Sequence, residues 1–468
     1  MTSPTGPTPA DARAIDDIGD TEDDADVEDI VGIGFGPSNL ALAIAVDEHN
    51  RRSPRRLRAT FLERQPAFGW HRGMLIDDAT MQVSFLKDLV TMRNPTSDFG
   101  FLPYLQERGR LVEFINHKTL FPLRIEFHDY LEWAAARLDH AVRYGEHVLG
   151  VRPVHRESDG RVVAFDVVSE GPGGRSARRA RNVVVAVGLA PRLPAGATTG
   201  PRVWHNRDLL PRADALPRDP APRRFMVVGA GQSAAEAVAY FHEKFPTAEV
   251  CSVFARYGYA PADDSPFANR IFDPGAVDDY FGSDDDVKRM LFDYHRNTNY
   301  SVVDGDLIEE LYRREYRERV QGRRRLRIMN VARVVGTDQQ GEHGERGVRV
   351  QVQSLTTRAV ETLDVDALVY ATGYRPVDPG SLLGEAGALV ERRADGSPVV
   401  HRDYRLQLTR PCGAAAVYVQ GGTEHSHGIS SSLLSNVAVR TGEILASVVA
   451  RRRLAPVLSR PVPVGASV

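Results

Sequence analysis

The chain contains little cysteine and no long apolar run. Its 468 residues include two cysteines, Cys251 and Cys412, which do not form a CxxC pair. This spacing excludes a redox-active dithiol of the disulfide-reductase kind and a cysteine-rich metal site. No stretch approaches the roughly 18 consecutive apolar residues of a membrane-spanning helix. We therefore expect no membrane location.

No charge of one sign dominates the chain. Lys and Arg number 59 and Asp and Glu number 62, which gives a formal net charge of −3. This balance points to neither nucleic acid nor an anionic membrane as a partner. The first residues are Pro-, Thr- and Ser-containing rather than basic and apolar, so secretion is not expected. A reducing, cytoplasmic setting fits both this start and the cysteine content.

Both ends of the sequence are expected to be loose. Residues 1–28 are acidic, contain proline and have few apolar side chains. Such a stretch cannot offset the entropy lost on ordering, so we predict a disordered tail. Residues 451–468, with three arginines followed by three prolines, are predicted to form a loose C-terminal tail.

A first glycine-rich turn follows the apolar strand that begins at Asp29. It has the pattern Gly34-x-Gly36-x-x-Asn39 and precedes an Ala-rich helix. Glycines at such a turn let backbone N–H groups approach a pyrophosphate at the helix N-terminus. The next strand, 57–63, ends in Glu63, and a carboxylate there suits a ribose hydroxyl pair. The amide of Asn39 replaces a third glycine and is expected to bond a ligand or the backbone.

A second turn of the same kind lies about two hundred residues later. It reads Gly229-x-Gly231-x-x-Ala234, between an apolar strand and another Ala-rich helix. The strand after it carries no terminal acid and is followed by Arg256, whose guanidinium suits a 2′-phosphate. Two such turns predict two dinucleotides, FAD at the first and NADPH at the second. The alternative for either turn is an ordinary strand–helix bend, and for Arg256 a solvated loop residue.

The order of the elements predicts an α/β fold with two Rossmann-like dinucleotide-binding domains and a small helical substrate region. The FAD domain is predicted over 29–200 and 375–450, and the NADPH domain is inserted between them at 201–374. A helical substrate-binding insertion is expected near 265–320. A buried parallel strand is expected over 182–187, a one-faced helix over 126–138 and a closing helix over about 430–450.

Four further segments resemble motifs of the N-hydroxylating flavoprotein monooxygenases and follow one another in the same order as in that family. They are residues 81–89 (MQVSFLKDL), 263–269 (DDSPFAN), 297–303 (NTNYSVV) and 371–374 (ATGY). More narrowly, the chain is similar to the microbial L-ornithine N-monooxygenases of hydroxamate siderophore biosynthesis. The similarity extends over roughly residues 29–447.

The resemblance implies roles for individual residues. Lys87 would hold the substrate carboxylate, and the other substrate-binding residues would be Asn269, Asn299 and Ser435. Fixed partners of this kind offset the cost of burying a zwitterionic amino acid. Besides both turns, Glu63 and Arg256, the implied cofactor-binding residues are Trp70, His71, Gln82, Val148, Gln232, Ser233, Asn299, Tyr300, Ser301, Ser432, Leu433 and Leu434. Without the surrounding motif, Lys87 would be interpreted as a surface lysine, and the asparagines as turn residues.

The resemblance also implies the chemistry. NADPH would reduce FAD, the reduced flavin would add O₂ to give a hydroperoxyflavin, and the side-chain amine of L-ornithine would be hydroxylated, with no acid–base dyad. L-Lysine and diamines are the alternative substrates, and a flavin/NADPH redox sensor is the non-enzymatic alternative. The resembling family implies a homo-oligomer, a tetramer.

His425 and His427 form a His-x-His pair, which also occurs in metal sites. No third ligand cluster is obvious in the sequence. We therefore expect no metal.

Overall fold

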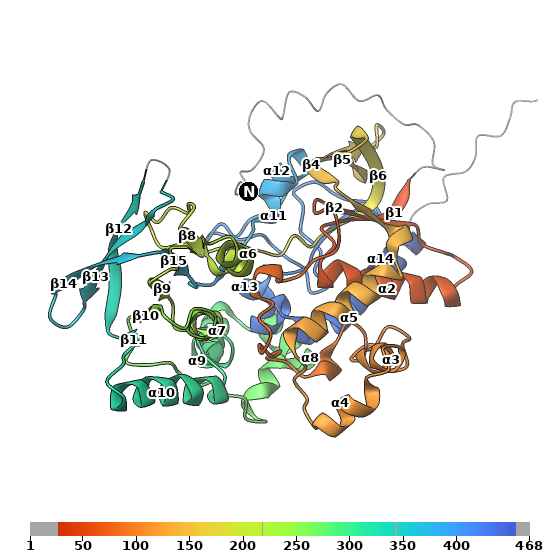
Figure 1. Ribbon diagram of the computed structural model, residues 1–468. Coiled ribbons are helices and arrows are strands. Elements are labelled where there is room, and N and C mark those ends of the chain that lie inside the picture. Colours follow the sequence, from red (N-terminus) through yellow and green to blue (C-terminus); the bar gives the residue numbers. More distant parts are fainter. Residues whose placement is uncertain (1–26, 218, 342–343, 455–468) are drawn as a thin grey trace, which may run out of the picture.

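The computed structural model describes residues 27–217, 219–341 and 344–454, which form two α/β halves (Figure 1). Most of both expected tails, 1–26 and 455–468, lies outside the described residues. The tail boundaries differ from the prediction, because Glu28 begins the first strand and residues 451–454 are the last turn of the final helix. Arg451 anchors that turn by donating from Nη2 to the carbonyls of Gly413 at 2.8 Å and Ala415 at 2.9 Å.

The first sheet is built around β1 (Glu28–Ile33), whose Ile30 and Val31 have no exposed surface. The strand order is β3-β2-β1-β6-β5-β4, and β17 also pairs with β6. The β1, β2, β3, β6 and β17 pairings are parallel, whereas β4, β5 and β6 are antiparallel. The bounds are β2 (Ala59–Glu63), β3 (Val142–Tyr144), β4 (His147–His155), β5 (Val162–Gly171), β6 (Gly174–Val185) and β17 (Ala416–Val419). Of the expected strand 182–187, residues 182–185 are the buried C-terminal part of β6, which ends two residues earlier than predicted.

Helices α2 (Pro37–Arg52), α5 (Arg124–Ala136) and α14 (Val437–Leu454) pack on the first half, where α2 contacts both of the others. The aromatic face predicted for α5 is buried, with Tyr130 at 0% and Trp133 at 5% exposure. The shorter helices α3 (Phe101–Glu107) and α4 (Leu111–His117) lie beside it.

The closing helix begins later than predicted. Residues 429–436 form two 3₁₀ turns, η8 (Ile429–Ser432) and η9 (Leu434–Asn436), before α14 starts at Val437. Gly428 has φ +79°, and the Ser431 hydroxyl donates to the Gly428 carbonyl at 2.7 Å. Serine side chains that bond the nearby backbone compete with helix formation, which explains the delayed start.

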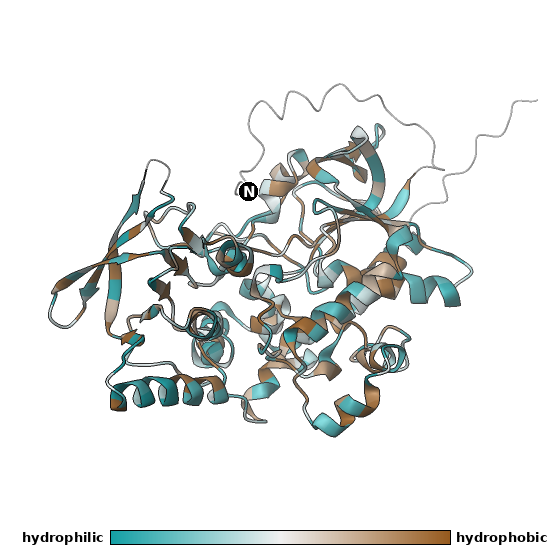
Figure 2. Ribbon diagram, viewed as in Figure 1, coloured by the Kyte–Doolittle hydropathy of each residue, from teal (hydrophilic) through white to brown (hydrophobic). Residues whose placement is uncertain are grey.

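The second sheet has the order β11-β10-β9-β15-β8, with every pairing parallel. Its strands are β8 (Val203–His205), β9 (Arg224–Val228), β10 (Glu249–Val253), β11 (Leu326–Met329) and β15 (Ala367–Tyr370). Helix α7 (Gln232–Lys244) covers it through Phe241, whose ring stacks on Phe225 at 4.2 Å. Much of the neighbouring helix α10 (Gly305–Val320) is hydrophilic (Figure 2).

A smaller antiparallel sheet, formed by β12 (Ala332–Gln340), β13 (Gly347–Ser354) and β14 (Val360–Val365), extends from the second half at the left of Figure 1. Its buried Val348 and Val350 pack with Met226 and Leu368 of the parallel sheet.

The chain crosses between the two halves twice, and the two crossing segments lie side by side. β7 (Leu189–Pro191) pairs antiparallel with β16 (Tyr374–Pro376). After the second passage, β17 joins β6 of the first sheet. The predicted α/β class with two dinucleotide-type sheets is confirmed.

The expected helical substrate region is divided between two environments. Its first part contains the 3₁₀ helix η6 (Ala268–Phe272), α8 (Pro274–Gly282) and α9 (Asp285–His295). Asp278 on α8 pairs with Arg402 of the first half at 2.6 Å. Helix α10 differs from the prediction, because its Leu311 belongs to the core of the second sheet. The predicted range of 265–320 was therefore too long.

Candidate functional site

The first glycine-rich turn connects β1 to α2. Gly34 has φ +85°, and a Cβ there would stand 2.6 Å from the carbonyl oxygen of Ala186. A Cβ on Gly36 would meet no heavy atom within 4 Å. Gly34 therefore closes the turn, whereas Gly36 keeps the space over the N-terminus of α2 open. Backbone N–H groups and the helix dipole favour an anionic ligand at that end, which fits a dinucleotide pyrophosphate.

Glu63 ends β2 beside this turn and is 7% exposed. Its Oε2 accepts from the Phe35 N–H at 2.7 Å, and its Oε1 accepts from the Gln65 N–H at 2.9 Å. Each carboxylate oxygen can accept a further hydrogen bond. The side chain is thus fixed at the strand end, where the predicted ribose contact requires an acceptor.

Asn39 bonds the backbone, which is one of the two kinds of partner expected for its amide. It is 0% exposed, its Nδ2 donates to the Gly34 carbonyl at 2.7 Å, and its Oδ1 accepts from Gln420 Nε2 at 3.0 Å. A side chain with no accessible surface and with protein partners at both ends of its amide cannot reach a ligand in this conformation. The Asn39 side chain therefore stabilises the turn, and a cofactor contact of Asn39 would have to come from its backbone.

The second turn connects β9 to α7 and is more crowded. Gly229 has φ +145°, and a Cβ there would stand 2.3 Å from the carbonyl oxygen of Ala371. A Cβ on Gly231 would lie 3.4 Å from Cα of Ser301, which has φ +58°. The segment around Ser301 therefore crosses directly over the turn.

Gln232 and Ser233 begin helix α7, as predicted for residues beside this turn. The Gln232 amide is held at both ends: Oε1 accepts from the Asp304 N–H at 2.8 Å, and Nε2 donates to Glu236 Oε1 at 3.0 Å. Glu236 in turn forms a buried pair with Arg124 of α5, at 2.6 Å and 2.8 Å. This Arg124–Glu236 pair joins the two halves of the molecule.

Arg256 lies in the loop after β10 and is exposed. Its Nη1 donates to the Ser301 carbonyl at 2.9 Å. Within the described part of the chain, no carboxylate oxygen lies within ion-pair distance of this guanidinium. Its charge is therefore available to a ligand near the Ser301 segment.

The segment predicted to contact the flavin turns sharply at His71, which has φ +50°. The His71 ring lies 4.6 Å from the Trp70 ring and 6.3 Å from the ring of Tyr374 in the ATGY segment. Although His71 is exposed, desolvation by the surrounding protein, with the nearby Arg124 charge, lowers its pKa to about 4. The imidazole is therefore neutral near pH 7.

Two other predicted flavin contacts have few interactions of their own. Gln82 is exposed, and its Nε2 reaches only the Thr80 hydroxyl, at 3.5 Å. Val148 is half-buried on β4 and packs against the core of the first sheet.

Lys87 is half-buried in the 3₁₀ helix η3 (Phe85–Lys87). Its Nζ lies 5.6 Å from the centre of the Phe272 ring. Desolvation lowers the pKa of Lys87, and the Asp273 carboxylate nearby opposes that shift. A partly dehydrated ammonium that has no closer ion pair among the described residues is suited to hold a carboxylate.

The other predicted substrate residues surround this lysine. Asn269 belongs to η6, the 3₁₀ helix that also contains Phe272, and its Nδ2 donates to the Asp264 carbonyl at 2.6 Å. Ser435 is 7% exposed in η9, which contacts η3. The structure thus brings Lys87, η6 and Ser435 together from three distant parts of the sequence.

Glu424 is a site residue that the sequence reasoning missed. It accepts a short hydrogen bond from the Tyr300 hydroxyl, and it also bonds Ser432. Desolvation raises the pKa of Glu424 despite these bonds. Asn299, next to Tyr300, bonds the same hydroxyl. Glu424 therefore connects the Asn299–Ser301 segment to the turn of Ser432, Leu433 and Leu434. In the sequence, Glu424 is notable only because it directly precedes the His-x-His pair of His425 and His427.

The two histidines of that pair bond the backbone. His425 Nε2 lies 2.9 Å from the Pro398 carbonyl, and His427 Nε2 lies 3.2 Å from the Arg402 carbonyl. Across residues 27–454, apart from the three undescribed positions, no three His, Cys, Asp or Glu side chains are grouped to hold a metal ion. No helix in the same part of the chain has the length and apolar character needed to cross a membrane.

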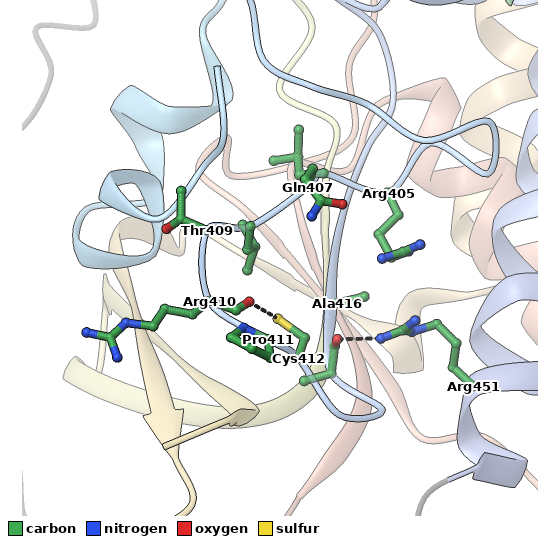
Figure 3. Close-up of a pocket in the computed structure, with 11 residues that line it drawn as sticks. Arg405, Gln407, Thr409, Arg410, Pro411, Cys412, Ala416 and Arg451 are labelled. Carbon is green, nitrogen blue, oxygen red and sulfur yellow. Dashed lines mark hydrogen bonds between the residues drawn. The ribbon is translucent and has the colours of Figure 1, made fainter. Parts of the chain in front are cut away.

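A cavity of about 250 Å³ lies elsewhere, between residues 405–416 and the end of α14 (Figure 3). Arg405, Arg451 and Cys412 line it. It contains none of the residues predicted to bind a cofactor or substrate, so we do not assign it to that site.

Comparison with known proteins connects these observations. The family described as L-lysine 6-monooxygenase/L-ornithine 5-monooxygenase matches residues 26–376. L-ornithine N(5)-monooxygenase from Burkholderia cepacia is 43% identical over 408 residues, which cover 86% of this chain and 90% of that protein.

Two solved structures are similar over nearly the whole chain. Ornithine N-hydroxylase from Kutzneria sp. 744, with reduced FAD, NADP⁺ and L-ornithine, has a TM-score of 0.85 and 48% identity, and the match covers 91% of this chain and 100% of that one. L-lysine 6-monooxygenase from Pseudomonas syringae has a TM-score of 0.78 and 31% identity, with 91% and 99% covered. On this agreement of sequence and structure, the chain belongs to the L-lysine 6-monooxygenase/L-ornithine 5-monooxygenase family.

Proposed function

We propose that this chain hydroxylates the side-chain amine of L-ornithine at N5, using FAD, NADPH and O₂. The product, hydroxyornithine, would supply a hydroxamate siderophore or a related natural product. The observation that carries the proposal is the convergence of Lys87, η6 and Ser435 in a family member with two dinucleotide turns. The Kutzneria enzyme, 48% identical, is named for ornithine, and the lysine enzyme, 31% identical, is more distant.

The two turns assign the cofactors. Gly34, Gly36 and Glu63 suit FAD at the first half, and Gly229 and Gly231 suit NADPH at the second. When bound and reduced by NADPH, FAD supplies the activation of O₂. Trp70, His71 and Gln82, the flavin contacts implied by the family resemblance, are proposed to lie beside the flavin ring. A neutral His71 adds no charge there.

The chain's own residues hold the amino acid. Lys87 neutralises the substrate carboxylate, while the amide oxygens of Asn269 and Asn299 accept from the α-ammonium group and from the neutral side-chain amine, respectively. The hydroxyl of Tyr300, fixed by Glu424, keeps Asn299 in place. Diamines lack the carboxylate, so they would forgo the contact with Lys87.

The test is a comparison of four amines with the FAD-loaded protein. We expect hydroxylamine formation with L-ornithine at the highest kcat/KM, and about 10–200-fold lower with L-lysine because one methylene separates the two. Putrescine and cadaverine should be poorer still. Preference for a diamine would contradict the role of Lys87. NADPH oxidation without any hydroxylated amine would favour the redox-sensor alternative.

We also propose a homo-oligomer in the cytoplasm. Both cysteines are free thiols, which suits a reducing compartment. Apolar side chains around α4 are exposed, including Val112 at 67% and Ile115 at 61%, and such patches mark subunit contacts. Light scattering of the FAD-loaded protein should give a multiple of the chain mass, and a monomer at micromolar concentration would contradict the proposal.

A further inference from the structure

Arg440 is a charged side chain buried inside the first half. It lies in the first turns of α14 and is 2% exposed. Its Nη2 donates to the Ser38 hydroxyl at 3.1 Å, its Nε donates to Gln420 Oε1 at 3.4 Å, and its Nη1 forms a short bond to the Ser431 carbonyl. All three acceptors are neutral.

No carboxylate forms a direct ion pair with Arg440 among the described residues. The ion pairs of the structure do not include Arg440, and the nearest acid on its own helix, Glu443, binds Arg402 at 2.8 Å and 2.9 Å. Tyr404 and Glu443 act on Arg440 only through space and raise its pKa, and the neighbouring His427 has its own pKa lowered in part by the charge of Arg440. Burial lowers the pKa of Arg440, because removing the charged guanidinium from water is unfavourable. A buried cation with only neutral partners is expensive unless a ligand supplies the opposite charge.

The contacts of Arg440 lead directly to the first glycine-rich turn. Ser38 is the second residue of α2, two positions after Gly36. Gln420, the second partner of Arg440, donates to the Ser38 carbonyl at 3.2 Å and to Asn39 Oδ1 at 3.0 Å. The N-terminus of α2 has its own partial positive charge. The guanidinium of Arg440 thus adds a full positive charge beside Ser38, at the positive end of α2, and an anion above the turn would stabilise both.

We propose that Arg440 is a positioning residue whose counter-charge is the pyrophosphate of the dinucleotide bound at the first turn. The inference rests on the proposed assignment of FAD to that turn. Arg440 acts through Ser38 and the helix end rather than by touching the ligand. Its bond to Ser431, next to Ser432 in η8, links the same charge to the turn that precedes Ser435.

The test measures ligand binding rather than turnover. Dissociation constants of FAD, ADP and riboflavin for the flavin-free full chain would be measured by fluorescence and calorimetry. Arg440→Met removes the charge and keeps a long, unbranched side chain. Arg440→Lys keeps the charge but lacks the planar guanidinium with its several N–H donors. Arg453→Met, on the exposed side of the same helix, is the matched control.

Arg440→Met should weaken FAD and ADP about tenfold to a hundredfold, with riboflavin unchanged, because riboflavin has no phosphate. Arg440→Lys should retain most of the affinity, and Arg453→Met all of it. Equal loss for all three ligands, or equal loss in the Lys and Met variants, would mean a purely structural role and overturn the inference. If Arg440→Met does not fold, the Lys variant still decides between charge and hydrogen bonding. If the unaltered chain binds no FAD, the proposed function itself fails.

Discussion

The environment of Lys87 predicts that this single side chain is needed to bind the substrate. Its ammonium is half-buried beside Phe272 and forms no ion pair among the described residues. Lys87→Ala should abolish coupled hydroxylation and leave FAD binding intact, because a charge-assisted contact in a partly dry site contributes about 2–5 kcal/mol. Lys244→Ala, on a half-exposed lysine of the second half, is the control. Unchanged saturation by ornithine in Lys87→Ala would assign Lys87 to the surface.

Arg256 is predicted to determine which nicotinamide is preferred. Among the described residues, its exposed guanidinium donates to the Ser301 carbonyl alone. Arg256→Ala should weaken NADPH by roughly 2–3 kcal/mol, while NADH, which lacks the 2′-phosphate, should hardly respond. Flavin reduction by both coenzymes measures the difference. Equal loss with the two would show that Arg256 places the Ser301 segment instead.

His427 predicts acid sensitivity of the fold. It is 0% exposed, its ring stacks on Tyr404 at 4.3 Å, and burial lowers its pKa to about 4. The unfolded chain, with an ordinary histidine pKa near 6.5, binds more protons between these two values. Stability is therefore complete above about pH 6.5 and falls by up to about 3 kcal/mol as the pH drops towards 4.

His427→Gln should flatten this part of the stability curve, which urea unfolding at pH 7 and pH 5 would measure. His155→Gln, on an exposed histidine, should keep the slope. A slope that is the same in His427→Gln as in the unaltered chain would place the titration elsewhere.

At the scale of elements, the two glycines of the first turn have separable roles. Gly34→Ala forces a side chain into positive φ and against the Ala186 carbonyl, so the flavin-free fold should lose about 1–3 kcal/mol or more. Gly36→Ala meets open space, so it should leave that stability unchanged and weaken FAD instead. Thermal midpoints without FAD, and FAD titrations, separate the two. Loss of flavin-free stability in Gly36→Ala would contradict the geometry.

The sequence was most informative where one local signal fits one element. The continuous apolar run before Gly188 predicted the end of β6, and the aromatic spacing of 126–138 predicted α5 within two residues at each end. The start of α14 was missed because Ser431 donates to the Gly428 carbonyl and Ser432 accepts from the Gly422 N–H, which favours 3₁₀ turns over the helix. The full burial of Asn39 and the role of Glu424 depend on Gln420 and Tyr300, which are distant in sequence. Such contacts are set by tertiary packing and leave no local pattern.

At the scale of the whole molecule, one buried ion pair joins the halves. Arg124 of α5 and Glu236 of α7 are 11% and 5% exposed and bind at 2.6 Å. Glu236→Gln leaves the guanidinium unpaired and should cost about 3–5 kcal/mol of stability. Because Gln232 also bonds Glu236, nicotinamide placement should suffer, seen as a higher KM for NADPH and more hydrogen peroxide per turnover.

The double variant Arg124→Met/Glu236→Met is the matched control, since apolar side chains of similar size can replace a buried pair at little cost. It should recover most of the stability lost in Glu236→Gln. If Glu236→Gln is as stable as the unaltered chain, the Arg124–Glu236 pair does not stabilise the contact between the halves.

The paired strands β7 and β16 have a consequence for the origin of such a chain. The Arg192 N–H donates to the Gly373 carbonyl at 3.0 Å, so the nicotinamide half leaves and re-enters the flavin half at one point. Deleting everything between these two residues would leave two ends already close enough for a short loop to join. The nicotinamide half is therefore an inserted domain. A single insertion into a surface loop of an ancestral flavin-binding protein would suffice to acquire it, and the strand order of neither sheet would have to change.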